Sequence, residues 1–390
     1  MRPEAVNPDL SRRNIQRVYG THFTGGNKVT LLRDRESFSA IFDAARNARE
    51  FICLAFYIFR NDETGLELAD ILRKKASEGV AVYILYDHFG SLGTPLKFWR
   101  KLRESGIRIR ASRPFKWSAP FRYFHRDHRK LIIVDGRYAF TGGLNIANEY
   151  SGYTRILKKL RKKRGWRDTG IFLEGPIAER LLDEFKKAWE IWKGGQIAFG
   201  GKAEPIEGGI PVLPIFASSA RGRRRMRRLL HYSINRAQRS IFITTAYFTP
   251  SRRMLKILED AVARGVEVIL LLPGKSDVSA ALYSARAYFS RLLKAGVAIY
   301  TYNGEILHAK TSVFDGLWSV IGSANLDFQS LRRNDEGNVG IVDEAFGKEM
   351  CTLFGEDLRN SERVELKTWQ QRPFCEKAKE HFFALFRRRL

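Results

Sequence analysis

The sequence predicts an α/β fold made of two similar halves, each with a mixed, mostly parallel sheet flanked by helices. Buried strands alternate with helices along the chain, which is typical of helices packed on a sheet. The same series of elements occurs twice, and internal repetition indicates duplicated domains. A short polar motif also occurs once in each half. We therefore expect an active site at the interface between two related domains.

The elements of the first half follow from hydrophobic periodicity. Residues 37–48 have helical spacing, whereas 49–59 form a nearly continuous apolar run rich in β-branched and aromatic residues, which indicates a buried strand. A helix is predicted over 66–79, ending at a glycine, and a strand over 80–87. Residues 101–110 then combine a helix end, a glycine and a short strand.

The second half repeats these elements in the same order. A helix-like segment at 227–238 precedes an apolar strand at 239–248. The next helix is predicted over 253–265, again ending at a glycine, and the next strand over 266–274. Residues 291–300 combine a helix end, a glycine and a short strand. The two halves are therefore predicted to share one topology.

The repeat sets the expected domain boundaries. We predict an N-terminal extension over 1–26, a first domain over 27–192, a linker over 193–209, a second domain over 210–360 and a basic amphipathic C-terminal segment over 361–390. The linker is rich in glycine and has no helix or strand periodicity.

Composition limits the class of protein. The 390 residues include 68 Lys and Arg against 42 Asp and Glu, a net charge of +26, which favours a polyanionic partner. Three distant cysteines form neither a disulfide framework nor a CxxC zinc site. The first residues lack the apolar core of a signal peptide. The longest apolar stretch, 51–59, is far shorter than the ~20 residues that span a bilayer, so membrane contact would be peripheral.

A repeated motif carries the candidate chemistry. Residues 128–135 read HRKLIIVD and residues 308–315 read HAKTSVFD, so both fit His-x-Lys-x4-Asp. The motif residues are His128, Lys130, Asp135, His308, Lys310 and Asp315. A second block follows each motif and contributes Gly143 and Asn145 in GGLN, and Ser323 and Asn325 in GSAN. Two copies in register with the repeat are not a product of chance.

The motif suits phosphate chemistry. Residues two apart on a strand face the same side, so two such strands would bring two histidines and two lysines to one cleft. A cationic pocket rich in donors matches a phosphate. One imidazole can attack phosphorus while the other protonates the leaving oxygen. The lysines and asparagines would stabilise the transition-state oxygens, and we expect no metal or other cofactor.

A histidine nucleophile needs a carboxylate to fix its tautomer. Glu149 and Glu336 follow the two motifs and are the candidates, with surface glutamates as the alternative interpretation. The motif residues Asp135 and Asp315 could orient the histidines instead. Their odd offset along the strand points them away from the site, so we interpret them as structural supports.

Other residues lie near the motifs in the sequence. Tyr57 and Tyr247 end equivalent strands, where they either line the pocket or pack in the core. His125 and Asp127 precede the first motif. Since no cysteine or third histidine lies nearby, we interpret His125 as a loop residue rather than as a metal ligand.

The paired motifs resemble those of the phospholipase D superfamily. The wider match is similar to its bacterial cardiolipin synthase branch, through FTGGLNIANEY, WRDTGIFLEGP, TAYFTP and VIGSANLDFQSLRRNDEGNV. The resemblance extends from about Val29 to about Glu344. Members with N-terminal membrane hairpins are not matched, so the chain is similar to the shorter, soluble-looking synthases.

The resemblance implies a transfer in two steps. By position, His128 would be the nucleophile that forms a phosphatidyl-histidine, and His308 would protonate the departing alcohol and deprotonate the incoming one. The halves are pseudo-symmetric, so the reverse assignment stays open. Family precedent also implies support across the interface, with Glu336 serving His128 and Glu149 serving His308.

Basic and aromatic segments favour a membrane partner. Residues 155–164 and 221–228 are dense in cations of one sign, and each such cation near an anionic bilayer contributes at most about 1 kcal/mol. Residues 113–124 and the C-terminal segment mix aromatics with cations, which suits an interface. Residues 113–124 form either the rim of a lipid entrance or a core-packed loop.

The expected function is cardiolipin synthesis from two phosphatidylglycerol molecules, with release of glycerol. We expect the protein in the cytoplasm, bound peripherally to the inner face of a bacterial cell membrane through phosphatidylglycerol and cardiolipin. The alternatives are hydrolysis of phospholipids to phosphatidic acid, an HKD-type nuclease and a non-catalytic lipid-binding module. Nucleic acid is not the expected partner, because the interfacial segments favour lipid.

Overall fold

The structure, a computed structural model, describes residues 7–115, 117, 125–152, 165–201 and 203–386. The strands of the first half are β1 (Thr24–Arg33), β2 (Phe51–Phe56), β3 (Ala81–Asp87), β4 (Arg108–Ser112), β5 (Leu131–Val134), β6 (Tyr138–Gly142) and β7 (Thr169–Glu174). Those of the second half are β8 (Ile210–Phe216), β9 (Ser240–Thr244), β10 (Glu267–Pro273), β11 (Ala298–Tyr302), β12 (Thr311–Phe314), β13 (Trp318–Gly322), β14 (Gly337–Val342) and β15 (Ser361–Arg363).

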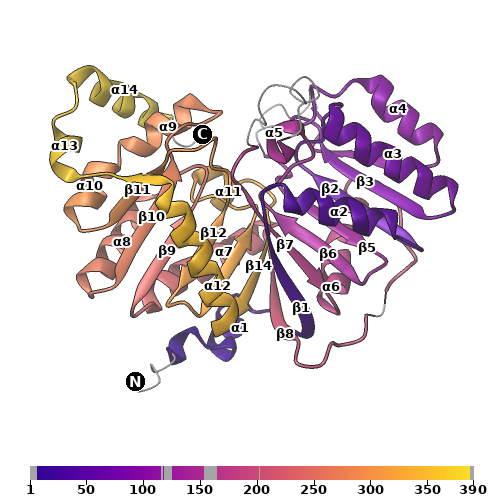
Figure 1. The fold of residues 1–390 in the computed structure, drawn as a ribbon, viewed down its shortest axis with the longest axis horizontal. Helices are drawn as coiled ribbons and strands as arrows, with labels where there is room; N and C mark the ends of the chain where they lie inside the picture. The colour runs from indigo at the N-terminus through magenta and orange to yellow at the C-terminus, as the bar shows by residue number, and fades with distance from the viewer. Residues whose placement is uncertain (1–6, 116, 118–124, 153–164, 202, 387–390) are drawn as a thin grey trace.

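Helices cover the sheet of each half (Figure 1). The helices up to residue 191 are α1 (Arg12–Tyr19), α2 (Glu36–Arg46), α3 (Glu63–Ser77), α4 (Leu96–Glu104), α5 (Asn148–Ser151) and α6 (Ile177–Ile191), preceded by the 3-10 turn Pro8–Leu10. Those of the remainder are α7 (Ala220–Arg236), α8 (Arg252–Ala263), α9 (Ser279–Arg286), α10 (Phe289–Lys294), α11 (Phe328–Arg332), α12 (Glu344–Arg359), α13 (Leu366–Gln370) and α14 (Phe374–Leu385).

The described strands form one continuous order, β15-β11-β10-β9-β12-β13-β14-β8-β1-β7-β6-β5-β2-β3-β4. This order is close to a palindrome of the two halves, which confirms the duplicated α/β fold. The halves join where β1 pairs with β7 on one side and β8 on the other. The motif strands β5 and β12 lie at corresponding positions in this order.

The expectation of mostly parallel pairing is wrong. Within the described sheet, parallel pairing is limited to β2–β3, β3–β4, β9–β10 and β10–β11. The motif strands instead return through short turns, β5 to β6 and β12 to β13, and a short turn joins only antiparallel neighbours. Asp135-Gly136 and Asp315-Gly316 make these turns, with φ of 52° and 62° in the first and 55° and 62° in the second.

A shared core fixes the two halves against each other. One cluster of buried apolar side chains includes Ile171 and Phe185 from the first half together with Val313 and Ile341 from the second. The N-terminal residues also cross over, because Tyr19 is buried in the core of the second half and donates its hydroxyl hydrogen bond to the Phe216 carbonyl. The interface is therefore a packed one, which keeps residues contributed by both halves in fixed positions.

The C-terminal helix α14 packs on α9, where the rings of Tyr283 and Phe383 stack at 5.6 Å. The remaining faces of α14 leave Phe374, Phe382 and Leu385 exposed. No helix in the described part of the chain is long and apolar enough to cross a membrane.

Candidate active site

The two motif histidines directly precede corresponding strands and are tied to the opposite half. His128 lies just before β5, and its backbone N–H donates to the Asp335 carbonyl at 2.9 Å. His308 lies before β12, and its N–H donates to the Arg167 carbonyl at 2.7 Å. Both histidines are buried, at 8% and 3% exposure. Each imidazole therefore sits on a strand end that the other half holds in place.

A carboxylate from the opposite half contacts each imidazole. Glu336 Oε2 lies 3.1 Å from His128 Nδ1, and Asp168 Oδ2 lies 2.7 Å from His308 Nδ1. Glu336 immediately precedes β14, and Asp168 immediately precedes β7, so the two carboxylates are equivalent in the repeat. Among the residues that the structure describes, Nε2 of neither imidazole has a hydrogen-bond partner.

The expectation that Glu149 serves His308 is wrong, since the contacting carboxylate is Asp168. Glu149 lies in α5 and is half-buried, and its backbone carbonyl accepts from the Trp166 N–H at 2.8 Å. Glu149 is the first carboxylate after the GGLN block, whereas Asp168 follows only after a longer segment that precedes β7. Aligning the strands that follow would have identified Asp168, in the WRDTG segment, as the partner of Glu336.

The lysines lie beneath the histidines. Lys130 Nζ donates to the His128 carbonyl at 2.8 Å, and Lys310 Nζ donates to the His308 carbonyl and lies 2.7 Å from His308 Nδ1. Burial lowers the pKa of Lys130 to about 7 and that of Lys310 to about 8, with the neighbouring Lys310 adding to the effect on Lys130. Burying two ammonium groups close together costs free energy unless an anion binds next to them.

Burial also sets the charge state of the other groups. It lowers the pKa of both histidines, and the nearby lysines add to this, so both imidazoles are neutral near pH 7. Burial raises the pKa of Asp168 to about 6. It acts in the same direction on Glu336, but His128 and Lys130 outweigh it and hold the pKa of Glu336 below its ordinary value.

The difference between Gly143 and Ser323 at equivalent positions matches the two carboxylates. The Ser323 hydroxyl donates to Glu336 Oε2 and accepts from the Gly337 N–H at 3.0 Å. At the equivalent Gly143, a Cβ atom would lie 2.1 Å from Asp168 Oδ1. The first half therefore needs glycine to admit Asp168, whereas the second half uses a serine to hold the longer Glu336.

Asn145 and Asn325 line the cleft and also position it. Asn145 Oδ1 accepts from the Ile58 N–H at 3.0 Å, and its Nδ2 donates to the Tyr150 hydroxyl at 2.8 Å. Asn325 Oδ1 accepts from the Tyr247 N–H at 3.3 Å. Each asparagine thus anchors the segment that follows the neighbouring strand.

Asp135 and Asp315 make their hydrogen bonds away from the imidazoles. The Asp135 carboxylate accepts from three successive backbone N–H groups, at residues 49–51, over 2.8–2.9 Å. Asp315 accepts from those at residues 238–240 and from the Asn7 side chain. Both carboxylates therefore hold the start of the neighbouring strand.

The site opens into a cleft of about 570 Å³ between the halves. It is lined by both histidines, both asparagines and the two tyrosines Tyr57 and Tyr247. The Tyr57 ring meets the His128 imidazole edge to face at 5.0 Å. The Tyr247 hydroxyl donates to the Asp277 carboxylate, 2.8 Å from its nearer oxygen. Both tyrosines therefore line the pocket, and each follows the end of a strand, β2 for Tyr57 and β9 for Tyr247.

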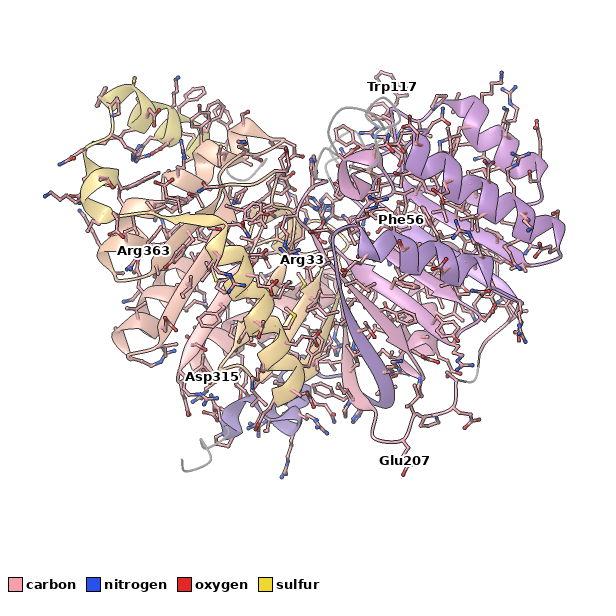
Figure 2. All side chains as sticks on the ribbon, in the orientation of Figure 1. Arg33, Phe56, Trp117, Glu207, Asp315 and Arg363 are labelled. Atoms are coloured by element: carbon pink, nitrogen blue, oxygen red, sulfur yellow. The ribbon has the colours of Figure 1, made fainter. Side chains whose placement is uncertain are left out.

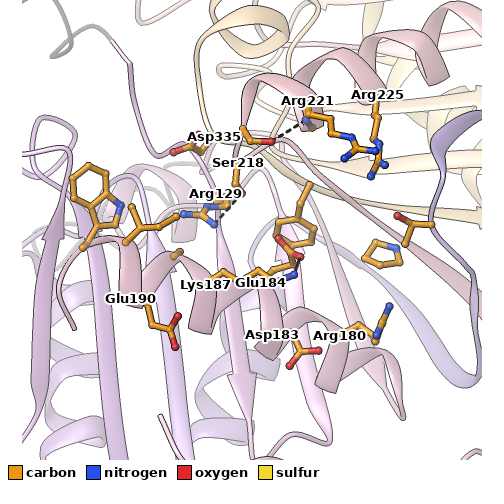
Figure 3. A pocket seen from close by; sticks show the side chains of 18 of the residues that line it. Arg129, Arg180, Asp183, Glu184, Lys187, Glu190, Ser218, Arg221, Arg225 and Asp335 are labelled. Atoms are coloured by element: carbon orange, nitrogen blue, oxygen red, sulfur yellow. Dashed lines mark hydrogen bonds and ion pairs between the residues drawn. The ribbon is translucent and has the colours of Figure 1, made fainter. Parts of the chain in front are cut away.

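A second, larger hollow of about 700 Å³ lies between α6 and α7 (Figure 3). It contains neither histidine, and many of its charges pair with one another, as Lys187 does with Glu184 at 2.6 Å. Asp335 lines this hollow, where it pairs with Arg113, while the next residue, Glu336, contacts His128 of the cleft. We therefore interpret the ion pairs of this hollow as structural.

Comparison with known proteins agrees with this geometry. A family model described as "Cardiolipin synthase, PLD-like domain" matches residues 41–189 and 230–358. The chain is 32% identical to the "Probable cardiolipin synthase YwiE" of Bacillus subtilis, over 93% of this chain and 72% of the relative. It is 33% identical to the "Major cardiolipin synthase ClsA" of the same organism, over 92% of this chain and 74% of the relative.

Among solved structures, the phosphatidylserine synthase of Haemophilus influenzae superposes with a TM-score of 0.75 at 14% identity, covering 97% of this chain and 100% of that one. At this identity the match shows the fold alone. The sequence matches go further, because they extend over most of both chains and include both motifs. The chain belongs to the cardiolipin synthase family of phospholipase D-like proteins.

Proposed function

We propose that this protein is a phosphatidyltransferase that joins two phosphatidylglycerol molecules into cardiolipin and releases glycerol. The observation that carries the proposal is the pair of imidazoles in one cleft, each with Nδ1 against a carboxylate and with no partner at Nε2 among the described residues. Family membership supplies the reaction class. The buried lysines supply positive charge for the phosphate, so the transfer needs no cofactor.

In the first step, His128 Nε2 attacks phosphorus and the bond from phosphorus to the glycerol oxygen breaks. His308 donates the proton that this oxygen takes up. The negative phosphodiester raises the pKa of His308 on binding, which supplies the imidazolium that general acid catalysis requires. Lys130 and Lys310 stabilise the equatorial oxygens.

In the second step, a hydroxyl of another phosphatidylglycerol attacks the phosphatidyl-histidine. Its proton passes to His308, the new phosphorus–oxygen bond forms, and the bond to His128 Nε2 breaks. The assignment of His128 as nucleophile is supported by its single partner at Nδ1, Glu336, which fixes the tautomer. His308 Nδ1 lies between Asp168 and Lys310, an arrangement suited to exchanging protons.

Exposed apolar side chains at the cleft and along one edge of the molecule support a peripheral membrane position. We call them the apolar rim: Phe89, Leu92, Leu96 and Trp117 from the first half, and Val278, Phe374, Phe382, Leu385 and Phe386 from the second. Phe89 and Val278 line the cleft itself. Helices α4 and α14 lie along the same upper edge of the molecule in Figure 1, and Trp117 projects from that edge in Figure 2. Single exposed apolar residues are ordinary, but a group along one edge marks an interaction site.

A cationic groove supports the choice of an anionic membrane. Six arginines line a hollow of about 970 Å³ formed by α7, α8 and α11: Arg224, Arg227, Arg228, Arg252, Arg253 and Arg332. Within the described residues no carboxylate forms an ion pair with any of the six. Burial and the arginines around it lower the pKa of His231 in this groove to about 4. Arg224, Arg227 and Arg228 of this groove belong to one basic run. The other run, 155–164, and most of the aromatic segment 113–124 lie outside the described residues.

The test uses purified protein, phosphatidylglycerol vesicles and excess EDTA, with lipid products followed by mass spectrometry. The proposal predicts cardiolipin and glycerol in equal amounts, and none from a His128→Ala variant. Phosphatidic acid as the sole product would identify a hydrolase instead. Cleavage of plasmid DNA without lipid turnover would move the activity to the nucleases of the superfamily.

A further inference from the structure

The two sides of the cleft differ in chemistry although the halves repeat. On the His128 side, Phe89 follows the end of β3, and the Arg126 guanidinium lies 4.2 Å from the centre of its ring. On the His308 side, Asp277 follows the end of the equivalent strand β10, and it holds the Tyr247 hydroxyl. All four side chains line the cleft. One side therefore offers a cation on an apolar ring, and the other offers a carboxylate.

A carboxylate opposes the binding of phosphate, because like charges repel. Asp277 is exposed and pairs with no cation in the described structure, so it does not serve as a structural ion pair. Its oxygens accept hydrogen bonds only: the Tyr247 hydroxyl lies 2.8 Å and 2.9 Å from the two oxygens, and the Ser276 hydroxyl donates to Oδ1 at 3.4 Å. A carboxylate has about four acceptor positions, so Asp277, which lines the cleft, can also accept from a ligand that donates hydrogen bonds.

Asp277 also lies within the electrostatic reach of the proposed acid–base residue. Burial, Lys310 and Lys130 lower the pKa of His308, and Asp277 acts in the opposite direction. A hydroxyl held between Asp277 and His308 would therefore belong to the alcohol that exchanges its proton with His308.

We propose that Asp277, oriented by Tyr247, binds the hydroxyl next to the attacking one and so selects acceptors that carry a vicinal diol, as the glycerol headgroup does. This inference rests on the proposed function. In the transfer, the primary hydroxyl oxygen of the acceptor bonds to phosphorus, the bond from phosphorus to His128 Nε2 breaks, and the hydroxyl proton goes to His308. The neighbouring hydroxyl donates to Asp277 throughout and changes no bond.

The experiment compares two acceptors that differ by a single hydroxyl. Phosphatidylglycerol vesicles are supplied as the donor with equal concentrations of 1,2-propanediol and 1-propanol, and mass spectrometry gives the ratio of the two phosphatidyl alcohols. One hydrogen bond to a charged group favours the diol by about tenfold or more. Asp277→Asn is expected to reduce the ratio to below about threefold, and Tyr247→Phe to an intermediate value.

Asp183→Asn is the matched control, since Asp183 is an exposed aspartate that lines the other hollow. Its ratio should equal that of the wild type. A ratio is internal to each enzyme, so it does not depend on the folded fraction of a variant.

Transfer by the wild type without preference for the diol, or an undiminished preference in Asp277→Asn, would overturn this inference and leave the proposed function intact. If the wild type forms neither phosphatidyl alcohol nor cardiolipin, the proposed function fails and the inference fails with it.

Discussion

Asp168 reaches His308 across the interface between the halves, with Oδ2 2.7 Å from Nδ1. Glu336 and His128 make the mirrored contact at 3.1 Å. Each half thus contributes one imidazole, together with the carboxylate that contacts the imidazole of the other half. Neither half contains both members of either pair, so the shared core between the halves keeps the two contacts in place.

Replacing Asp168 should separate its role from that of Glu149. Asp168→Asn keeps the shape but favours the wrong tautomer of His308, so we expect cardiolipin formation to fall by about 10³-fold. Glu149→Gln should stay within about threefold of the wild type, because the carboxylate contact at His308 belongs to Asp168. Equal losses in the two variants, both shown to be folded by circular dichroism, would contradict this assignment.

The buried lysines should give the rate an alkaline limit. Lys130 and Lys310 have pKa values lowered by burial to about 7 and about 8, so each loses its charge as pH rises through these values. Since kcat/KM reports the free enzyme, it should fall from about pH 7 upward. Lys130→Arg keeps the charge, and its profile should begin to fall only near pH 8, where Lys310 titrates. An unchanged profile in Lys130→Arg would exclude Lys130 as the cause.

The motif residue Asp315 should affect stability rather than chemistry. Asp315→Ala leaves several backbone N–H groups and the Asn7 amide without their acceptor, and we expect a loss of about 2–4 kcal/mol in the free energy of unfolding. Calorimetry measures this loss. The activity per folded molecule at low temperature should remain near the wild-type value, and its disappearance in a fully folded variant would give Asp315 a direct chemical role.

The apolar rim should control attachment to lipid. Phe382→Ser combined with Leu385→Ser removes two exposed apolar side chains, each worth about 1.5–3 kcal/mol when buried. We expect at least about tenfold weaker partitioning into phosphatidylglycerol vesicles, measured by sedimentation. Ile191→Ser is the control, because Ile191 is equally exposed but lines the second hollow. Equal losses in both would show that binding does not depend on the rim.

Repetition made most of the fold and site accessible to sequence reasoning. Continuous apolar runs such as 239–248 predicted the buried strands, and the motif pattern located His128 and His308 on corresponding strands. The antiparallel return after each motif was missed, although Asp135-Gly136 and Asp315-Gly316 are turn dipeptides that commonly join hairpins.

The sequence alone could not identify Asp168 as the partner of His308, for a physical reason. Asp168 and His308 meet only when the halves pack, and the longer segment before β7 places Asp168 far from the first motif in the sequence, beyond the nearer Glu149. Asp277 gave no sequence signal either, because it belongs to no motif and gains its place in the cleft from the loop after β10. The expected domain boundaries stay predictions, although Tyr19 of the N-terminal extension packs into the core of the second half.

The most direct test of the account is the identity of the histidine that carries the phosphatidyl group. His308→Ala is incubated with a phosphatidyl ester of p-nitrophenol, whose departure needs no acid, and the protein is digested at neutral pH for mass spectrometry. The account predicts a phosphatidyl adduct on His128 that accumulates, since the acceptor cannot be deprotonated, and no adduct in His128→Ala. An adduct on His308 in His128→Ala, with none on His128 in His308→Ala, would contradict it.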